Sequence, residues 1–373
     1  MKAMQNNHKI HKEPFVYITK RGELPRRQAL LIKSLVILVG IIFCAIVTVL
    51  ITGENPIKVF SAMIKGSFGS PRKIWNLLQA SAILLGISLA VTPAFKMRFW
   101  NTGAEGQVLI GMLASISCMI YIGDSLPSWL LIIISLFASI VAGAVWAGIP
   151  GFFKAIWNTN ETLFTLMMNY VAAQLVSLLI MFWVPSGSMV LGLVNSNSQN
   201  GWFPTIFGQK YLLNIIIVGL LTAAIHIYLK KSKQGYEISV VGESENTARY
   251  IGINVKKVII RTVLISGALC GVMGWILAAG TDHSINSSAV AGNGFTAIMV
   301  SWMSKFNPIT MIFSSILVCF LQKGAGEIAS NLGLNSSVGE VLTGIIILFI
   351  VSSEFFVNYQ VHFRKNSRKE KAE

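Results

Sequence analysis

The sequence contains few charged residues, and acidic ones are the scarcer kind. Asp, Glu, Lys and Arg make up 12% of the 373 residues, and only 15 residues are acidic. An ordinary soluble domain carries roughly 25% charged residues. A soluble globular fold is therefore excluded as an interpretation of this chain.

Cysteine is also scarce, and the usual catalytic motifs are missing. The four cysteines, Cys44, Cys118, Cys270 and Cys319, lie in apolar runs without CxxC spacing. Such cysteines are typically small buried side chains rather than disulfide or metal ligands. The sequence has no GxxxxGK[ST], HExxH or GxSxG motif, and its five histidines are scattered. We therefore expect no enzymatic activity, no metal site, no cofactor and no ATP bound by this chain.

Long apolar runs, in contrast, recur along nearly the whole chain, which is 54% hydrophobic. About 20 apolar residues in a helix cross the roughly 30 Å of hydrocarbon in a bilayer. The sequence thus predicts an all-α membrane protein, a polytopic bundle of about ten transmembrane helices, of which the eighth and ninth are short. The predicted spans are residues 30–52, 75–95, 104–122, 129–149, 162–184, 211–229, 262–280, 289–303, 309–322 and 338–356.

The positive charge, a net +15, indicates orientation rather than binding of nucleic acid. If the N-terminus is cytoplasmic, 23 of the 30 Lys and Arg residues lie on that side and six on the other. Cytoplasmic loops carry such an excess, so both termini are predicted to be cytoplasmic. The chain then divides into a basic N-terminal segment (1–29), a transmembrane domain (30–356) and a basic tail (357–373).

Two connections between spans are long. Residues 185–210, on the outside, include Trp202 and Phe203. They form either a docking surface for an external partner or a plain solvated loop. Residues 230–261, on the cytoplasmic side, contain the signals of a short helix.

In that cytoplasmic loop, Ser244 is a typical N-cap, Glu245 lies in the first turn and Arg249 follows at i+4. Gly252 can adopt the left-handed conformation that ends a helix. The helix would have about two turns, or roughly 12 Å, and would be too short to be stable alone. It is either a rigid element that fits a groove on a cytoplasmic partner or an ordinary connector.

Several polar residues are predicted to lie inside the bilayer. Asn101, Glu105 and Gln107 open the third span, with Gly103 and Gly106 between them. A charge in hydrocarbon is costly, so Glu105 should face the bundle interior, a helix N-terminus or water. The two glycines would allow close helix approach or a broken helix start.

A similar pattern recurs at two other places. Asn160 and Glu161 open the fifth span, with Asn169 two turns later, and Gly292-Asn293-Gly294 opens the short eighth span. Interrupted helices at corresponding positions of two halves indicate a midplane pathway, so spans 2–5 and 7–10 are a possible inverted repeat. Glu105 and Glu161 either stabilise helix N-termini or act as ligands or proton carriers. Gly267-xxx-Gly271 is typical of tight helix packing.

Four segments resemble permeases of the ribose, simple-sugar and nucleoside branch of ABC importers. Residues 99–111 (FWNTGAEGQVLIG) are similar to the FN-x-G-x-EGQ-x-x-IG segment of that family, and residues 160–171 (NETLFTLMMNYV) to its NE-x-x-x-TLM-x-NYVA segment. Residues 241–253 (VGESENTARYIGI) resemble the cytoplasmic GEN-x-x-AARYAGI coupling segment, and residues 292–298 (GNGFTAI) the G-x-GF-x-x-I segment. The four occur in family order. Trp100, Phe164 and Ser301-Trp302 depart from the pattern.

The resemblance implies a permease subunit in a bacterial cytoplasmic membrane. Its partners would be a cytoplasmic ATPase that hydrolyses ATP, a second permease subunit, identical or not, and an extracytoplasmic substrate-binding lipoprotein. It also implies that the loop 230–261 couples to the ATPase through Gly242, Glu243, Ser244, Glu245, Ala248, Arg249 and Gly252. The candidate pathway residues are Asn101, Glu105, Gln107, Asn160, Glu161, Asn169 and Asn293.

The TLM-x-NY segment and the extended basic N-terminus look most like nucleoside-type permeases that pair with basic-membrane-protein lipoproteins. The expected substrate is a nucleoside, a purine nucleoside in particular. A simple sugar of the ribose or galactose type is the alternative. A secondary transporter in which Glu105 or Glu161 carries a proton, and a scaffold without transport activity, are further alternatives.

Overall fold

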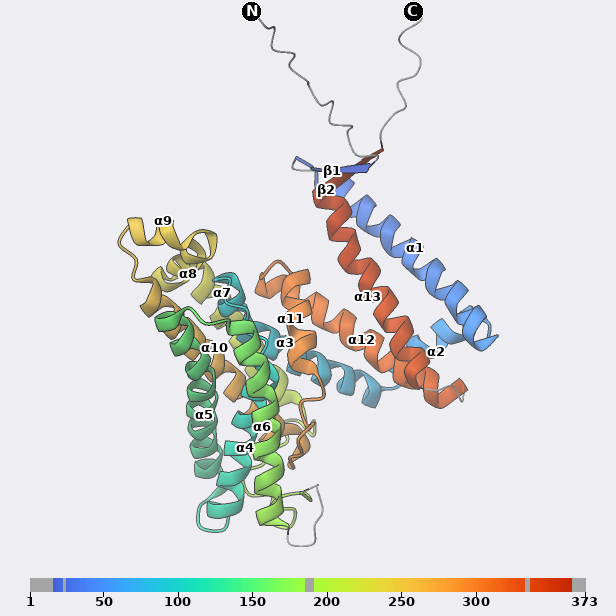
Figure 1. Ribbon diagram of the computed structural model, residues 1–373. Helices are drawn as coiled ribbons and strands as arrows, with labels where there is room; N and C mark the ends of the chain where they lie inside the picture. The colour runs from blue at the N-terminus through green and yellow to red at the C-terminus, as the bar shows by residue number, and fades with distance from the viewer. Residues whose placement is uncertain (1–15, 23–24, 185–190, 333–335, 364–373) are drawn as a thin grey trace, which may run out of the picture. The chain divides into compact units, whose positions relative to one another are not determined.

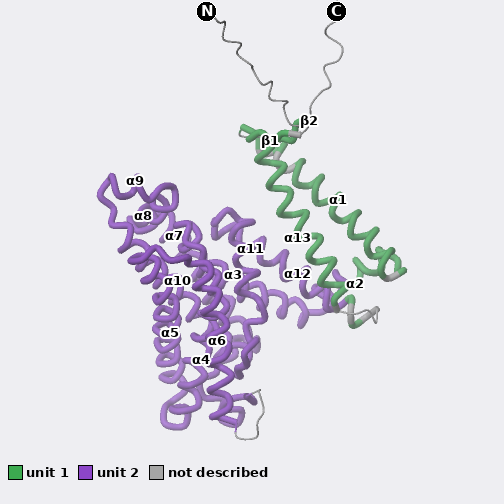
Figure 2. The backbone as a smooth tube through the Cα atoms, in the orientation of Figure 1, with its two compact units in different colours: residues 1–62, 328–373 green, residues 63–327 purple. Residues whose placement is uncertain are grey.

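The computed structural model describes residues 16–22, 25–184, 191–332 and 336–363, and these residues are mostly helical (Figure 1). Most of the predicted N-terminal segment, part of the tail and residues 185–190 of the external loop lie outside the described residues. The chain forms two compact units (Figure 2). Unit 1 comprises residues 1–62 and 328–373, and unit 2 comprises residues 63–327.

In unit 1, the first and the last long helix pair along their length. The helix α1 (Arg26–Thr52) contacts α13 (Ser336–Asn358) through an ion pair between Lys33 and Glu354 and through the rings of Phe43 and Phe349, whose centroids are 5.8 Å apart. Gly40 leaves room for Phe349, because a Cβ there would lie 2.7 Å from that side chain. The helix α2 (Pro56–Phe68) begins in this unit.

Two short strands at the ends of unit 1 were not among the predicted elements. The strand β1 (Val16–Lys20) pairs antiparallel with β2 (Tyr359–Phe363) in a register that joins Val16 to Phe363 and Lys20 to Tyr359. Because β1 precedes α1 and β2 follows α13, the pairing holds the beginning of α1 and the end of α13 at the same end of the unit. This arrangement is compatible with the predicted location of both termini on one side of the membrane.

Unit 2 contains the remaining long helices. They are α3 (Pro71–Lys96), α4 (Ala104–Ile122), α5 (Ser128–Trp157), α6 (Glu161–Trp183), α7 (Leu212–Lys231), α10 (Val255–Leu277) with a π-helical turn (Ala278–Asp282), α11 (Asn293–Met303) and most of α12 (Pro308–Leu332), together with the short α8 (Lys233–Glu243) and α9 (Glu245–Tyr250). Most residues of α3, α4 and α10 are buried, whereas most of α5, α6 and α7 are not. The centre of the unit is thus formed by α3, α4 and α10.

Small residues bring α10 against α5 and α4, as the Gly267-xxx-Gly271 pattern predicted. A Cβ at Gly271 would lie 2.0 Å from the carbonyl oxygen of Ser139 in α5, and one at Gly267 would lie 2.3 Å from the Cβ of Ala147. The Ser139 hydroxyl donates to the carbonyl of Gly111 in α4 at 2.8 Å. Backbones approach this closely only where side chains are small.

Nine helices of the described chain are long and apolar enough to span a membrane, against about ten predicted. The eighth predicted span, residues 289–303, is the exception, because α11 has only eleven residues. Non-helical residues 283–292 precede it, and Trp302 near its end contacts Phe95 near the end of α3. The helix α11 is thus too short to span a membrane by itself, and the last part of the non-helical segment occupies the start of the predicted span.

Two other spans are longer than predicted. The ninth was predicted as residues 309–322, but α12 continues to Leu332 past Lys323 and Glu327. The ammonium of Lys73 lies 2.6 Å from the Glu327 carboxylate. Because Glu327 is paired in this way, its charge is compatible with the continuation of α12. The helix α5 continues past Pro150 to Trp157.

Candidate functional site

The short helix predicted in the cytoplasmic loop is present as α9. The Ser244 hydroxyl accepts the Thr247 N–H at 3.2 Å, and Arg249 lies 3.3 Å from Glu245. Gly252 has a φ of +85°, and the Ile253 N–H bonds the Ala248 carbonyl at 2.9 Å across it. The cap, the i,i+4 pair and the left-handed stop are all confirmed.

A second helix, α8, supports α9 and was missed from the sequence. Its Ile238 and Val241 are buried with Ala248 of α9 and Val255 and Val258 of α10. Two glycines in eleven residues hid the helix. The N-cap at Ser232, whose hydroxyl accepts the Gly235 N–H at 2.9 Å, and the i,i+3 spacing of Ile238 and Val241 were the available signals.

Two contacts fix α8 to the membrane helices. A Cβ at Gly242 would lie 2.1 Å from the carbonyl oxygen of Lys96, so only glycine permits this approach to the end of α3. Glu237 forms an ion pair with Arg261 of α10 at 2.9 Å. The outer residues of α9 are exposed, and Tyr250 is 93% exposed. The polar helix α9, with the exposed ring of Tyr250, is thus supported by α8, which is itself fixed to α3 and α10.

The second group of predicted residues surrounds the start of α4. The side-chain amides of Asn101 and Gln107 bond each other in both directions, at 2.9 and 3.1 Å. Asn101 also accepts the Gly103 N–H at 3.1 Å and donates to the Ser266 hydroxyl at 3.4 Å. Both amides are buried. They hold the non-helical residues 97–103, so that α4 begins inside the protein, as a broken helix start.

Asn169 joins α6 to the same place. Its amide oxygen accepts the Gly106 N–H at 2.8 Å, and its NH₂ group donates to the carbonyl of Thr102 at 2.9 Å. Gly106 is required here, because a Cβ would lie 2.9 Å from the Asn169 oxygen. These amides satisfy backbone groups at the helix break, and their direct contact with a transported solute stays a prediction.

Glu105 connects the two interrupted helices. Its two carboxylate oxygens accept the N–H groups of Gly292 and Gly294, each at 2.7 Å. Free N–H groups and the helix dipole favour a negative charge at this position. Glu105 thus faces the N-terminus of α11. A helix N-terminus was one of the three environments predicted for it. Asn293, another candidate, is half-buried at the first position of α11.

The remaining candidates lie at the start of α6. Glu161 is buried and lies 2.9 Å from the ammonium of Lys154 in α5. Asn160 is exposed and caps α6 by accepting the Leu163 N–H at 3.2 Å. The structure therefore brings Asn101, Glu105, Gln107, Asn169 and Asn293 together and leaves Asn160 and Glu161 at the start of α6.

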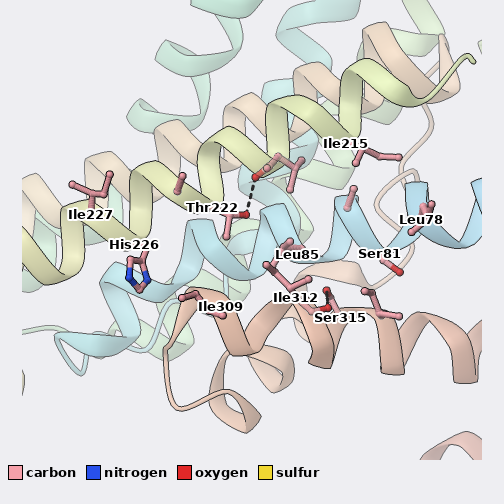
Figure 3. Close-up of a pocket in the computed structure, with 15 residues that line it drawn as sticks. Leu78, Ser81, Leu85, Ile215, Thr222, His226, Ile227, Ile309, Ile312 and Ser315 are labelled. Atoms are coloured by element: carbon pink, nitrogen blue, oxygen red, sulfur yellow. Dashed lines mark hydrogen bonds between the residues drawn. The ribbon is translucent and has the colours of Figure 1, made fainter. Parts of the chain in front are cut away.

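A cavity of about 570 Å³ lies between α3, α7 and α12 (Figure 3). Leu85, Ile215 and Ile312 line it, and the Thr222 hydroxyl is bonded to the Val218 carbonyl of its own helix at 2.8 Å. None of the candidate pathway residues lines this cavity. Its apolar walls suit a hydrocarbon chain better than a polar solute.

The described part of the external loop is fixed to the end of α10. The rings of Trp202 and His283 are stacked with centroids 3.8 Å apart, and Phe203 donates its N–H to the Ala279 carbonyl at 2.8 Å. The Trp202 indole donates to the Val194 carbonyl, and Val194 donates its N–H to the His283 carbonyl. Burial lowers the pKa of His283, and the charge of Lys210 lowers it further. The segment is thus packed, and docking of a partner on it stays a prediction.

Residues 73–351 match the family described as branched-chain amino acid transport system / permease component. The chain belongs to this permease family. It is a polytopic membrane permease of the ABC importer class, as the four sequence segments implied.

Relatives of this permease cover nearly its whole length. The guanosine ABC transporter permease protein NupP of Bacillus subtilis is 28% identical over 93% of this chain and 98% of its own. The glucose ABC transporter permease protein TsgB13 of Haloferax volcanii is 27% identical over 82% and 83%. The nucleoside ABC transporter permease protein NupB of Lactococcus lactis is 27% identical over 85% and 90%.

Proposed function

We propose that this permease is the membrane-spanning subunit of an ABC importer for nucleosides, purine nucleosides in particular. Two of the three relatives described above are named for guanosine or nucleosides, and the alignment with the first covers 93% of this chain. The glucose permease of Haloferax volcanii supports the alternative, a simple sugar.

The observation that supports the importer mechanism is the packing of α9 on α8. An ATPase that closes on ATP must push on an element that transmits displacement to the membrane helices. The exposed α9 offers such a contact, and Gly242 and the pair of Glu237 with Arg261 join its base to α3 and α10. Gly242, Glu243, Ser244, Glu245, Ala248, Arg249 and Gly252 form this coupling segment in the proposal.

The partners in the proposal are a cytoplasmic ATPase, a second permease subunit and an extracytoplasmic substrate-binding lipoprotein. The permease would lie in a bacterial cytoplasmic membrane with both termini in the cytoplasm, since 23 of its 30 Lys and Arg residues then face that side. Seven residues, Asn101, Glu105, Gln107, Asn160, Glu161, Asn169 and Asn293, are the proposed pathway.

The substrate is tested by competition in cells that carry this permease as their only system of its kind. Uptake of labelled guanosine should fall with unlabelled guanosine, inosine or adenosine and should be insensitive to ribose, galactose and glucose. A matched strain without the permease gives the background. Stronger competition by a sugar than by any nucleoside would replace the proposal with the sugar alternative.

Coupling is tested at the cap of α9. Ser244→Ala removes the acceptor for the Thr247 N–H, which costs about 1 kcal/mol of helix stability. We expect uptake and co-purification of the ATPase to fall severalfold, and Ser244→Asp, another good N-cap, to restore both. If Ser244→Ala retained both at equal protein level, α9 would not be the coupling element.

A proton-coupled transporter is the remaining alternative. Glu105 accepts two backbone N–H groups, and Glu161 forms an ion pair with Lys154, so both carboxylates already have structural partners. We therefore expect no uptake in liposomes that contain this chain alone under a pH gradient. Uptake under those conditions would support the secondary transporter instead.

A further inference from the structure

A smaller cavity of about 350 Å³ lies between α8 and the ends of α3 and α11, on the side of unit 2 that is predicted to be cytoplasmic. Phe95, Trp100, Trp302 and Phe306 form its aromatic wall. Trp100 and Trp302 are stacked with centroids 5.1 Å apart, and Phe306 meets Trp302 edge-on at 5.7 Å. The two indoles are 45% and 48% exposed, so the stack is only partly covered by neighbouring side chains.

The charged residues of the cavity are unbalanced. Lys96, Arg98 and Glu243 line it, and Lys230 lies close enough to Lys96 for the two ammonium groups to repel. In the described chain, no ion pair involves Lys96, Arg98 or Glu243. The ammonium of Lys96 and the guanidinium of Arg98 outnumber the single carboxylate of Glu243, which favours binding of an anion.

Arg98 holds its place in a conformation that a side chain disfavours. It has a φ of +61° at the position after the end of α3, where Phe99 donates its N–H to the Ala94 carbonyl at 3.0 Å. Glycine usually fills this position, and the same permease places Gly252 there at the end of α9. Strained residues of this kind are found at ligand sites. The disfavoured φ of Arg98 therefore makes its guanidinium a candidate for ligand binding.

A partly exposed aromatic stack beside two cations matches a ligand that is both a flat ring and an anion. We propose that this cavity binds a nucleoside monophosphate from the cytoplasm, with its base on the Trp100–Trp302 stack and its phosphate on Lys96 and Arg98. Glu243 accepts a ribose hydroxyl. The volume of about 350 Å³ lies within the roughly 300–1,000 Å³ typical of small-ligand sites.

Ser239, Gly242 and Glu243 of α8 form the opposite wall of the same cavity. A bound ligand therefore bridges the base of the coupling segment to the ends of α3 and α11 and resists displacement of α8. The site would inhibit uptake when the monophosphate accumulates inside the cell. This consequence rests on the proposed function, whereas the binding site itself does not.

The experiment uses inside-out membrane vesicles with the full permease and its partners, photolabelled with radioactive 8-azido-GMP. The permease band is separated from the ATPase, and the labelled peptide is identified by mass spectrometry. We expect label on residues near Trp100 or Trp302, competition by GMP, and at least tenfold weaker competition by guanosine, ribose 5-phosphate or inorganic phosphate.

Arg98→Gly is the deciding variant, because it removes the guanidinium and relieves the strained φ together. It should reduce labelling at least tenfold without lowering the melting temperature. Phe207→Gly relieves a similar φ of +49° in an exposed loop and should leave labelling unchanged. Trp302→Leu provides a second test of the ring site and should also reduce labelling.

The proposal is overturned if Arg98→Gly and Trp302→Leu leave the labelling unchanged or if the label lies elsewhere. Equal competition by inorganic phosphate, or loss of label when phosphatidylglycerol is added to the vesicles, would instead show a simple phosphate or lipid-headgroup site. The ratio of nucleoside uptake with and without GMP on the cytoplasmic side tests regulation separately. If nucleosides are not transported but labelling follows the variants, only the proposed function fails.

Discussion

Glu105 accepts hydrogen bonds from Gly292 and Gly294, which follow it by 187 and 189 positions in the sequence. Each carboxylate oxygen accepts one of these two N–H groups. In Glu105→Gln the NH₂ group faces one of the two N–H groups, which leaves a partly buried donor without an acceptor, at a cost of about 1 kcal/mol. We expect a lower melting temperature in detergent and faster amide exchange at residues 292–296.

Glu245→Gln is the matched control for that substitution. Glu245 is exposed and pairs with Arg249 at the surface, where such pairs contribute less than about 1 kcal/mol. Its melting temperature should remain close to that of the wild type. An equal loss in both variants would mean that the Glu105 contacts do not stabilise α11.

His283 gives the external side a dependence on pH. Burial lowers its pKa below the usual 6.5, so the folded state favours the neutral ring. Because the unfolded state then binds a proton more readily than the folded state, the free energy of unfolding decreases as the pH falls below 6.5. From pH 7.5 to 5.5 the wild type should lose more melting temperature than His283→Gln, with fluorescence of Trp202 as a local probe. Equal losses would contradict this.

Among the elements, the contact of α10 with α5 is the most sensitive to a single methyl group. At Gly271 a Cβ would lie 2.0 Å from a backbone oxygen, which cannot move without its helix. Gly271→Ala should cost about 1–3 kcal/mol, measured as reduced melting temperature and uptake. Gly219→Ala in α7 meets nothing within 4 Å and should be neutral or stabilising by up to about 1 kcal/mol.

The sequence predicts elements well where the signals are local. Ser244, Glu245, Arg249 and Gly252 lie within nine residues, and each acts on its own helix, so α9 could be predicted. The contact of Glu105 with Gly292 could not, because it joins distant segments whose packing no periodicity describes. The length of α11 was also missed, since residues 289–292 are apolar enough to extend the run but turn before the helix begins.

At the scale of the molecule, we expect the pairing of β1 with β2 to place both ends of the chain on one side of the membrane, and the excess of Lys and Arg predicts that this side is the cytoplasmic one. Two highly exposed residues test both. Tyr250 in α9 is 93% exposed, and Phe207 in the external loop is 92% exposed. Tyr250→Cys should react with an impermeant thiol reagent in inside-out vesicles only, and Phe207→Cys in right-side-out vesicles only.

The native cysteines give little background in that labelling. Cys44, Cys270 and Cys319 are buried, and Cys118 is partly buried. The chain without the two substitutions is the control. Labelling of both variants from the same side would contradict the topology.

The pairing of α1 with α13 also has a consequence for biosynthesis. The helix α1 ends at Thr52, and its partner begins only at Ser336. At about 5–20 residues per second, translation of the intervening chain takes roughly 15–60 s. During that time α1 waits in the membrane without its partner. It is the most apolar of the described spans, which makes it the one best able to remain alone in lipid until the last helix arrives.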